Sequence, residues 1–167
     1  YISVPKLPKE SASDYEARCW RERIHYDEKE NVFIPGAMFK NCLSAAAKYL
    51  SMQIPGKGKS TFTKNIEAGI MCYEPVYIGI KKNDVEGETL FVPANGQRGG
   101  TTRVEKQFPK IREWEGTVSF LIIDSIITKD IFEKHLTEAG SLIGIGRFRP
   151  RNNGYYGRFI VENIEWS

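Results

Sequence analysis

The sequence predicts an α+β fold of the ferredoxin-like type, with the order β-α-β-β-α-β and an antiparallel sheet. Helical and strand patterns alternate along the chain, and 41% hydrophobic with 27% charged residues is the composition of a globular protein. A length of 167 residues suits one domain. We expect a single domain over residues 1–167 with an irregular insertion around residues 81–116. The chain begins with Tyr1, not Met, so the first strand is expected to be missing or truncated.

The first half of the chain contains two predicted helices. Residues 13–23 begin with Ser13 and carry Glu16 three positions later, which is the pattern of a capping box. Residues 31–34 form a short apolar run that indicates a strand. The clearest helix is residues 37–53, where an apolar stripe at helical spacing predicts one buried face, made of Phe39, Cys42, Leu43, Ala46 and Leu50.

The second half alternates strands with one helix. Residues 69–80 indicate a strand with Pro75 at an edge or bulge, and residues 89–92, 117–123 and 158–166 indicate three more. Residues 93–110 are expected to be a loop. Thr128 is expected to cap a helix that Gly144 ends, and its broad apolar face is Ile131, Phe132, His135, Leu136, Ala139, Leu142 and Ile143.

The three cysteines favour a reducing compartment. Cys19, Cys42 and Cys72 are odd in number and form no C-x-x-C motif, which argues against a disulfide framework or a zinc site. No run approaches the roughly 20 apolar residues that a membrane helix needs. We therefore expect a cytoplasmic protein, in a bacterium or in the host if a phage encodes it, with no cofactor and no membrane partner.

Charge is segregated although the net charge is only +3. Residues 31–66 contain Lys40, Lys48, Lys57, Lys59 and Lys64 but no acid, and residues 139–161 contain four arginines and no acid. Local fields attract a polyanion more than the total charge does. If the two segments fold side by side, five lysines and four arginines would line one surface.

Residues 144–158 combine arginine, glycine and aromatic side chains. Arginine binds phosphate oxygens, glycine lets a backbone approach a ligand, and aromatic faces can stack on bases. The alternative is a glycine-rich turn whose arginines are solvated. The candidate residues are Gly144, Gly146, Arg147, Phe148, Arg149, Arg151, Gly154, Tyr155, Tyr156, Gly157 and Arg158.

Catalytic and metal motifs are weak. The Gly58-Lys59-Ser60 unit lacks the earlier glycine of a P-loop, and Gly144-Ile-Gly146 lacks the third glycine of a dinucleotide fingerprint. His135 falls on an apolar helix face and is expected in the core. His25 is a surface histidine in one interpretation and a general base in another. Asp124 is expected to cap a turn rather than bind metal.

Two motifs resemble a known superfamily. Ile34-Pro35-Gly36 before a helix resembles the start of the first helix in RAMP proteins of the Cas7-like type, and the glycine-rich segment after residue 143 resembles their glycine-rich loop. Asn41 and Cys42 depart from the family, which has Gly-Ala there. The resemblance implies an RRM-like fold that binds single-stranded RNA, with Lys40 and Lys48 facing the nucleic acid. The whole chain also resembles uncharacterised bacteriophage and prophage proteins.

Three functions follow as hypotheses. The first is a non-catalytic protein that binds single-stranded nucleic acid, with RNA more expected than DNA. It would act as a homo-oligomer along the strand or as a subunit of a ribonucleoprotein complex, as CRISPR-associated proteins do. The second is a metal-independent endoribonuclease of the RAMP type with His25 as its base. The third is a phage protein that interacts with or inhibits a host nucleic-acid complex.

Overall fold

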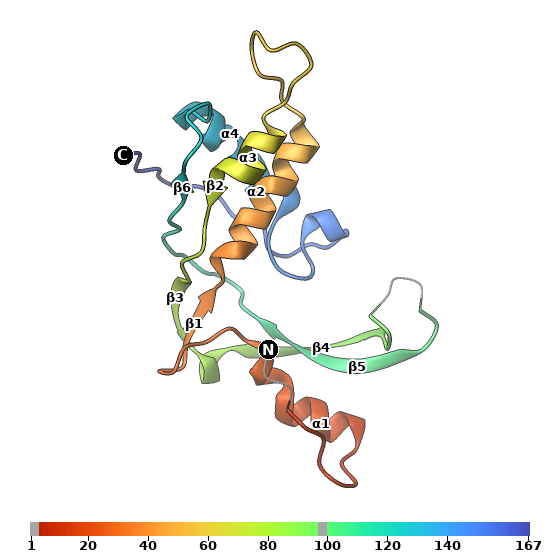
Figure 1. Ribbon diagram of the computed structural model, residues 1–167. Coiled ribbons are helices and arrows are strands. Elements are labelled where there is room, and N and C mark those ends of the chain that lie inside the picture. Colours follow the sequence, from red (N-terminus) through yellow and green to blue (C-terminus); the bar gives the residue numbers. More distant parts are fainter. Residues whose placement is uncertain (1–3, 97–99) are drawn as a thin grey trace. The chain divides into compact units, whose positions relative to one another are not determined.

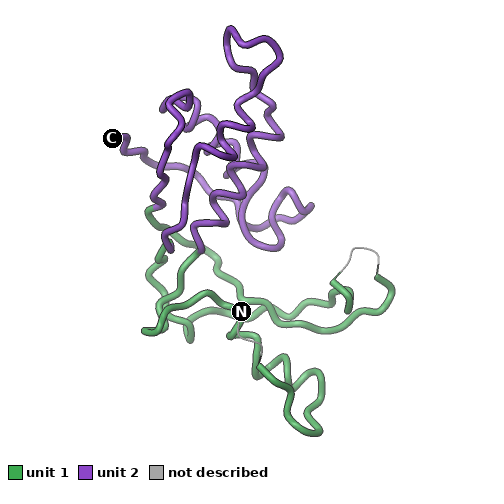
Figure 2. The backbone as a smooth tube through the Cα atoms, viewed as in Figure 1, with its two compact units in different colours: residues 1–34, 76–117 green, residues 35–75, 118–167 purple. Residues whose placement is uncertain are grey.

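The computed structural model describes residues 4–96 and 100–167. The chain forms two compact units, which Figure 2 distinguishes by colour. Unit 1 comprises residues 1–34 and 76–117, and unit 2 comprises residues 35–75 and 118–167. Each unit is described separately below.

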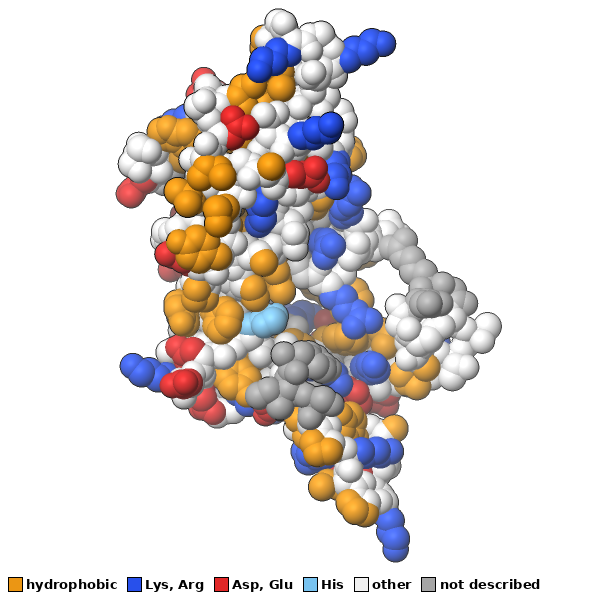
Figure 3. All heavy atoms as spheres, viewed as in Figure 1, with side chains coloured by type: hydrophobic (Ala, Val, Ile, Leu, Met, Phe, Trp, Pro, Cys, Tyr) orange, Lys and Arg blue, Asp and Glu red, His pale blue; other side chains and the backbone are white. Residues whose placement is uncertain are grey.

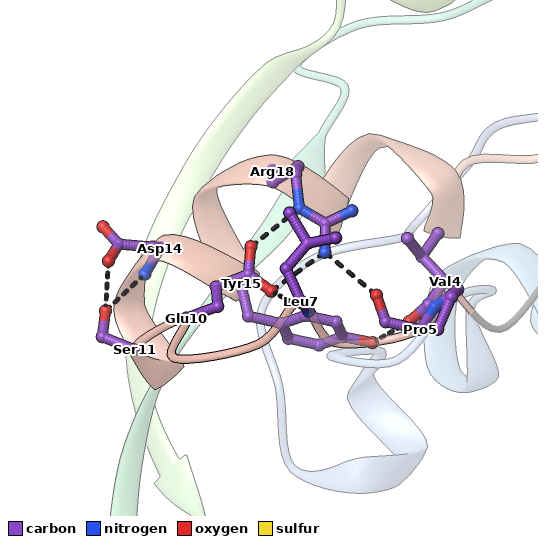
Figure 4. A network of polar contacts seen from close by, with 8 residues as sticks. All are labelled: Val4, Pro5, Leu7, Glu10, Ser11, Asp14, Tyr15 and Arg18. Carbon is purple, nitrogen blue, oxygen red and sulfur yellow. Dashed lines mark hydrogen bonds and ion pairs between the residues drawn. The ribbon is translucent and has the colours of Figure 1, made fainter.

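Unit 1 begins with helix α1, Ala12–Cys19, which continues as the 3-10 turn η1, Trp20–Arg23. Ser11 caps the helix rather than the predicted Ser13, because the Ser11 Oγ accepts the Asp14 N–H at 3.0 Å. Arg18 binds Glu10 with its Nε at 2.7 Å and the Pro5 carbonyl with Nη2 at 3.0 Å, as Figure 4 shows. This network attaches the chain before α1 to the helix.

The remainder of unit 1 is two antiparallel pairs of strands (Figure 1). Strand β1, Asn31–Ile34, pairs with β3, Val76–Lys81, and β4, Glu86–Pro93, pairs with β5, Arg103–Lys110. A 3-10 turn, η2, Lys82–Asp84, links β3 to β4. The loop predicted for residues 93–110 is therefore wrong for its second half, which is strand β5; residues 97–99 of that prediction lie outside the described residues.

Side chains from α1 and η1 cover the outer edge of β5. Glu16 accepts the Gln107 N–H at 3.4 Å, and Arg23 donates to the Gln107 carbonyl at 2.9 Å. The same two side chains form an ion pair at 2.6 Å, and this bond lowers the pKa of Glu16. An edge strand with free N–H and C=O groups is prone to pair with other chains. The Glu16–Arg23 pair occupies one such position on β5.

Unit 2 is built from helices on a small antiparallel ladder. Its helices are α2, Gly36–Leu50; α3, Thr63–Gly69; and α4, Lys129–Glu138, which continues as the π-helix η3, Ala139–Ile143. The ladder pairs β2, Ile70–Met71, with β6, Leu121–Ile122, and a 3-10 turn η4 spans Pro150–Asn152. Within the described residues no helix has the length and hydrophobicity needed to cross a membrane.

The predicted stripe of α2 forms the core of unit 2. Phe39, Cys42, Leu43 and Ala46 are buried, and Leu50 is partly buried. Leu43 and Ala47 join Ile66 and Ile70 of the next elements in one apolar cluster with Phe132 and Leu136 of α4. Helix α3 was not predicted. The predicted end at Gly144 of the helix that follows Thr128 is confirmed, since Gly144 has a φ of 70°.

The α+β class is confirmed, but the described strands form no ferredoxin-like sheet. The described strands form three separate two-stranded antiparallel sheets. Residues 69–80, predicted as one strand, divide at Pro75 into β2 and β3, which belong to different units. Only residues 121–122 of the predicted strand 117–123 pair with a neighbour, and residues 158–166 form no regular strand.

These two segments nevertheless alternate in burial like strands. Phe120 and Ile122 in one, and Phe159 and Val161 in the other, pack partly buried against the core cluster, whereas Leu121 and Ile160 are 52% and 83% exposed. A period of two is the pattern of a strand face on a core. The sequence signal is therefore correct about side-chain direction, but no hydrogen-bonded ladder joins the two segments among the described residues.

His135 is fully buried in α4, as predicted. Its Nδ1 lies 2.7 Å from the Ile131 carbonyl, so Nδ1 carries a hydrogen, and its Nε2 is buried without a partner in the part of the chain that the structure describes. Burial opposes the charged imidazolium and lowers the pKa of His135.

The lowered pKa of His135 predicts a loss of stability in acid. Below pH of about 6.5 the unfolded histidine binds a proton that the folded one rejects, so the free energy of unfolding should fall by up to about 1.4 kcal/mol per pH unit until the folded pKa is reached. Above a pH of about 6.5 the histidine is neutral in both states, so the free energy of unfolding no longer depends on its protonation. Urea titrations from pH 7.5 to 5 should show a shallower pH slope for His135→Leu than for the wild type; equal slopes would contradict the assignment.

Candidate functional site

The candidate site is the segment of residues 144–158, here called the arginine–glycine loop, together with α2. The loop is held by hydrogen bonds between its own backbone groups. Ile145 donates to the Gly157 carbonyl at 2.8 Å, Tyr156 donates to the Phe148 carbonyl at 3.1 Å, and Gly154 donates to the Arg149 carbonyl at 3.1 Å. The loop is therefore a closed, ordered turn.

Glycine is required where the two arms of this loop meet. A Cβ on Gly157 would lie 1.9 Å from the Ile145 carbonyl oxygen, and one on Gly154 would lie 1.9 Å from the Phe148 carbonyl oxygen. Gly144 similarly meets Pro150 at 2.7 Å. Gly146, with a φ of 81°, has nothing within 4 Å of its Cβ position. Three of the four predicted loop glycines are thus needed because neighbouring atoms of the chain leave no room for a side chain. Gly146 is the one of the four with open space at its Cβ position.

The segments on either side of the loop pack against the first half of α2. Phe159 lies edge-on to Phe39 with 5.7 Å between ring centroids, and the Cys42 Sγ donates to the Ala139 carbonyl at 3.3 Å. Burial raises the pKa of Cys42 to about 11, although the nearby charge of Arg149 acts in the opposite direction. Cys42 therefore stays a neutral thiol in the core. The segments that lead into and out of the loop, at Ala139 and Phe159, therefore lie against α2.

The arginines of the loop differ in what they contact. Arg149 donates to the Gly146 carbonyl at 2.8 Å, and Arg158 donates to the Ser141 carbonyl at 3.1 Å, so both support the loop. Arg147 lies over the Phe148 ring at 5.9 Å from its centroid. Arg151 is exposed and forms no ion pair with any carboxylate that the structure describes.

The aromatic side chains of the loop face outward. Tyr155 is 88% exposed and Tyr156 is 50% exposed, whereas Phe148 is partly buried. Exposed aromatic rings offer faces on which unpaired bases can stack. The loop thus presents two exposed tyrosine rings and the exposed side chain of Arg151.

Two of the predicted lysines are engaged within the chain. Lys40 donates to the carbonyls of Ile66 and Glu67 at 2.6 and 2.9 Å, where it caps the C-terminal end of α3, and desolvation lowers its pKa. Lys48 forms an ion pair with Glu67 at 2.7 Å. Both side chains therefore point towards α3, on the flank of α2 that faces away from Cys42.

The other three predicted lysines are exposed. Lys57 and Lys59 lie in the loop after α2, and Lys64 lies in the first turn of α3. None forms an ion pair with a carboxylate in residues 4–96 or 100–167. Figure 3 shows Lys and Arg side chains gathered on the visible face of unit 2 around α2, with few acidic side chains among them.

His25 and Asp124 lie outside this surface. His25 is exposed in unit 1, its ring 6.0 Å from that of Phe33, and partial desolvation lowers its pKa. Asp124 accepts the Ile126 N–H at 3.1 Å and the Asn65 Nδ2 at 2.8 Å, which confirms its role as a turn cap. The described residues contain no cluster of His, Cys, Asp or Glu that could hold a metal ion.

Comparisons with known proteins found no match to this chain among family models, curated proteins or solved structures. The site is therefore interpreted from its own geometry.

The glycine geometry predicts a clear difference between two alanine variants. Gly146→Ala should cost about 1 kcal/mol, because alanine is strained at a positive φ but meets no neighbour. Gly157→Ala should cost a further 1–3 kcal/mol or so, since its Cβ overlaps the Ile145 carbonyl. Thermal unfolding of both variants checks this; equal melting temperatures would show that the loop arms are not in contact.

Proposed function

We propose that this protein binds single-stranded nucleic acid without chemical conversion of it, and that the arginine–glycine loop is the centre of the binding surface. The observation that carries the proposal is a loop without acidic residues that combines a Tyr155 that is 88% exposed with an exposed Arg151, which forms no ion pair with a described carboxylate. The preference for RNA over DNA rests on the resemblance of the sequence to RAMP proteins.

The loop supplies the two interactions that single strands use. A guanidinium forms charge-assisted hydrogen bonds to phosphate oxygens, which are sequence-independent. A tyrosine ring offers a face on which an unpaired base stacks, and such stacking contributes about 1–3 kcal/mol per base. In a duplex the faces of the bases are already covered, so the exposed tyrosines favour a single strand.

The closed backbone of the loop supports this assignment. Because the hydrogen bonds across Ile145, Phe148 and Gly157 fix the turn, the positions of Arg151 and Tyr155 are set before a ligand arrives. Ordering a flexible loop on binding would consume part of the interaction energy. A preformed loop avoids that cost, which suits a surface whose individual contacts are weak.

Replacement of Tyr155 and Arg151 should separate the two interactions. Tyr155→Ala should weaken binding of a labelled single-stranded RNA by about 1–3 kcal/mol, whereas Tyr155→Phe should retain most of the affinity because stacking needs only the ring. Arg151→Ala should lower the slope of log K against log salt by about 0.7, since one phosphate contact is lost. Fluorescence anisotropy over a series of salt concentrations measures both.

Lys129→Ala is the matched control, because Lys129 is an exposed cation of unit 2 on α4. It removes the same charge away from the loop and should leave the salt slope unchanged. Equal losses for Arg151→Ala and Lys129→Ala would indicate attraction by net charge alone. If Tyr155→Ala does not alter the affinity for the RNA, the loop is not the binding surface.

A further inference from the structure

A second cationic feature lies beyond the C-terminal end of α2. Residues 51–62, here called the lysine tip, form a closed turn in which Ile54 donates to the Ser60 carbonyl at 2.8 Å and Phe62 donates to the Met52 carbonyl at 3.0 Å. Ile54 is 7% exposed and anchors the tip in the core cluster. Lys57 and Lys59 are exposed at its end, which Figure 1 shows projecting past α2.

One flank of α2 connects the two cationic features. Cys42, which is buried against the segment leading into the arginine–glycine loop, and Tyr49 are seven residues apart, so Tyr49 lies on the same side of α2 as that segment, closer to the C-terminal end of the helix. Tyr49 is 61% exposed. Ala45, between them, is too small to obstruct this flank. Residues 31–66 contain no acid, so nothing on the helix or the tip repels a phosphate backbone.

We propose that a single nucleic-acid strand runs along this flank, from the arginine–glycine loop past Tyr49 to Lys57 and Lys59. The inference rests on the proposed function and adds the class of ligand: an extended strand long enough to reach both ends, rather than a mononucleotide or a short oligonucleotide. Tyr49 stacks on a base in the middle of the path, and the two lysines contact phosphates at its far end.

The length of α2 sets the minimum size of this ligand. Eight residues separate Cys42 from Leu50, which is about 12 Å of helix at 1.5 Å per residue. A stacked strand advances about 3.4 Å per nucleotide, so it needs about four nucleotides to pass the helix alone. The lysine tip lies beyond Leu50. An oligonucleotide of roughly 4 nucleotides cannot contact both ends, and one of roughly 12 can.

The test compares these two lengths of a labelled single-stranded oligonucleotide by fluorescence anisotropy. For the long strand, a Lys57→Ala, Lys59→Ala double variant should lower the salt slope by about 1.4, which corresponds to two lost phosphate contacts. For the short strand, held at the arginine–glycine loop, the same variant should bind like the wild type. Tyr49→Ala should weaken the long strand roughly 5- to 100-fold, and Tyr49→Phe should not.

Two controls match these variants. Lys129→Ala with Lys134→Ala removes two exposed cations from α4, and Tyr73→Ala removes a tyrosine that is 70% exposed beside the β2–β6 ladder. The lysine control should change the affinity for both strands only by the small amount that the loss of two positive charges causes. Tyr73→Ala should leave the affinity for both strands unchanged.

The outcomes separate the two proposals. If the lysine-tip variant affects short and long strands equally, or no more than the α4 control does, the path along α2 is wrong while the loop can still bind. If Arg151→Ala and Tyr155→Ala leave binding of both lengths intact, the proposed function fails whatever the lysine tip does.

Discussion

The close backbone contact inside the arginine–glycine loop is the constraint on which the site depends. Its arms approach to distances at which a Cβ on Gly157 or Gly154 would overlap a carbonyl oxygen. A Cβ on Gly140 would likewise overlap the carbonyl oxygen of Phe159, which in turn packs on Phe39 of α2. Glycine at these positions therefore closes the loop and lets the segment after it pack on the helix. Arg151 and Tyr155 extend into solvent from this closed backbone.

Some of the lysines in the acid-free segment of residues 31–66 are not available to bind a ligand. Lys40 caps the end of α3 and Lys48 pairs with Glu67, so the regular spacing of these lysines serves packing between two helices. Lys57, Lys59 and Arg151, which lie in turns, form no ion pair with a described carboxylate. The set of cations available on the candidate surface is therefore smaller than the sequence suggested.

Local patterns predicted three of the four described α-helices and the burial of their side chains, but not α3 or the pairing of strands. The apolar stripe of α2, the core position of His135 and the positive φ of Gly144 each follow from a few neighbouring residues. Which strands pair depends on contacts between residues far apart in the sequence. Strands β2 and β3, which lie on either side of Pro75, belong to different sheets.

In the site, the composition of residues 144–158 indicated exposed arginine and tyrosine. It could not show that most of the glycines serve the loop itself. For Tyr49, which the proposed path includes, the spacing of seven from Cys42 was the signal available in the sequence.

The most direct measurement of the central claim is ultraviolet crosslinking of the wild-type protein to a single-stranded RNA, followed by mass spectrometry of the crosslinked peptides. Aromatic rings that stack on bases are in position to crosslink, and the exposed tyrosines of unit 2 come from different elements. Crosslinks at Tyr155, with further ones at Tyr156 and Tyr49, are the predicted result. Crosslinks concentrated at Tyr73, or at Phe91 of strand β4, would contradict the account, as would their absence at a concentration where binding is saturated.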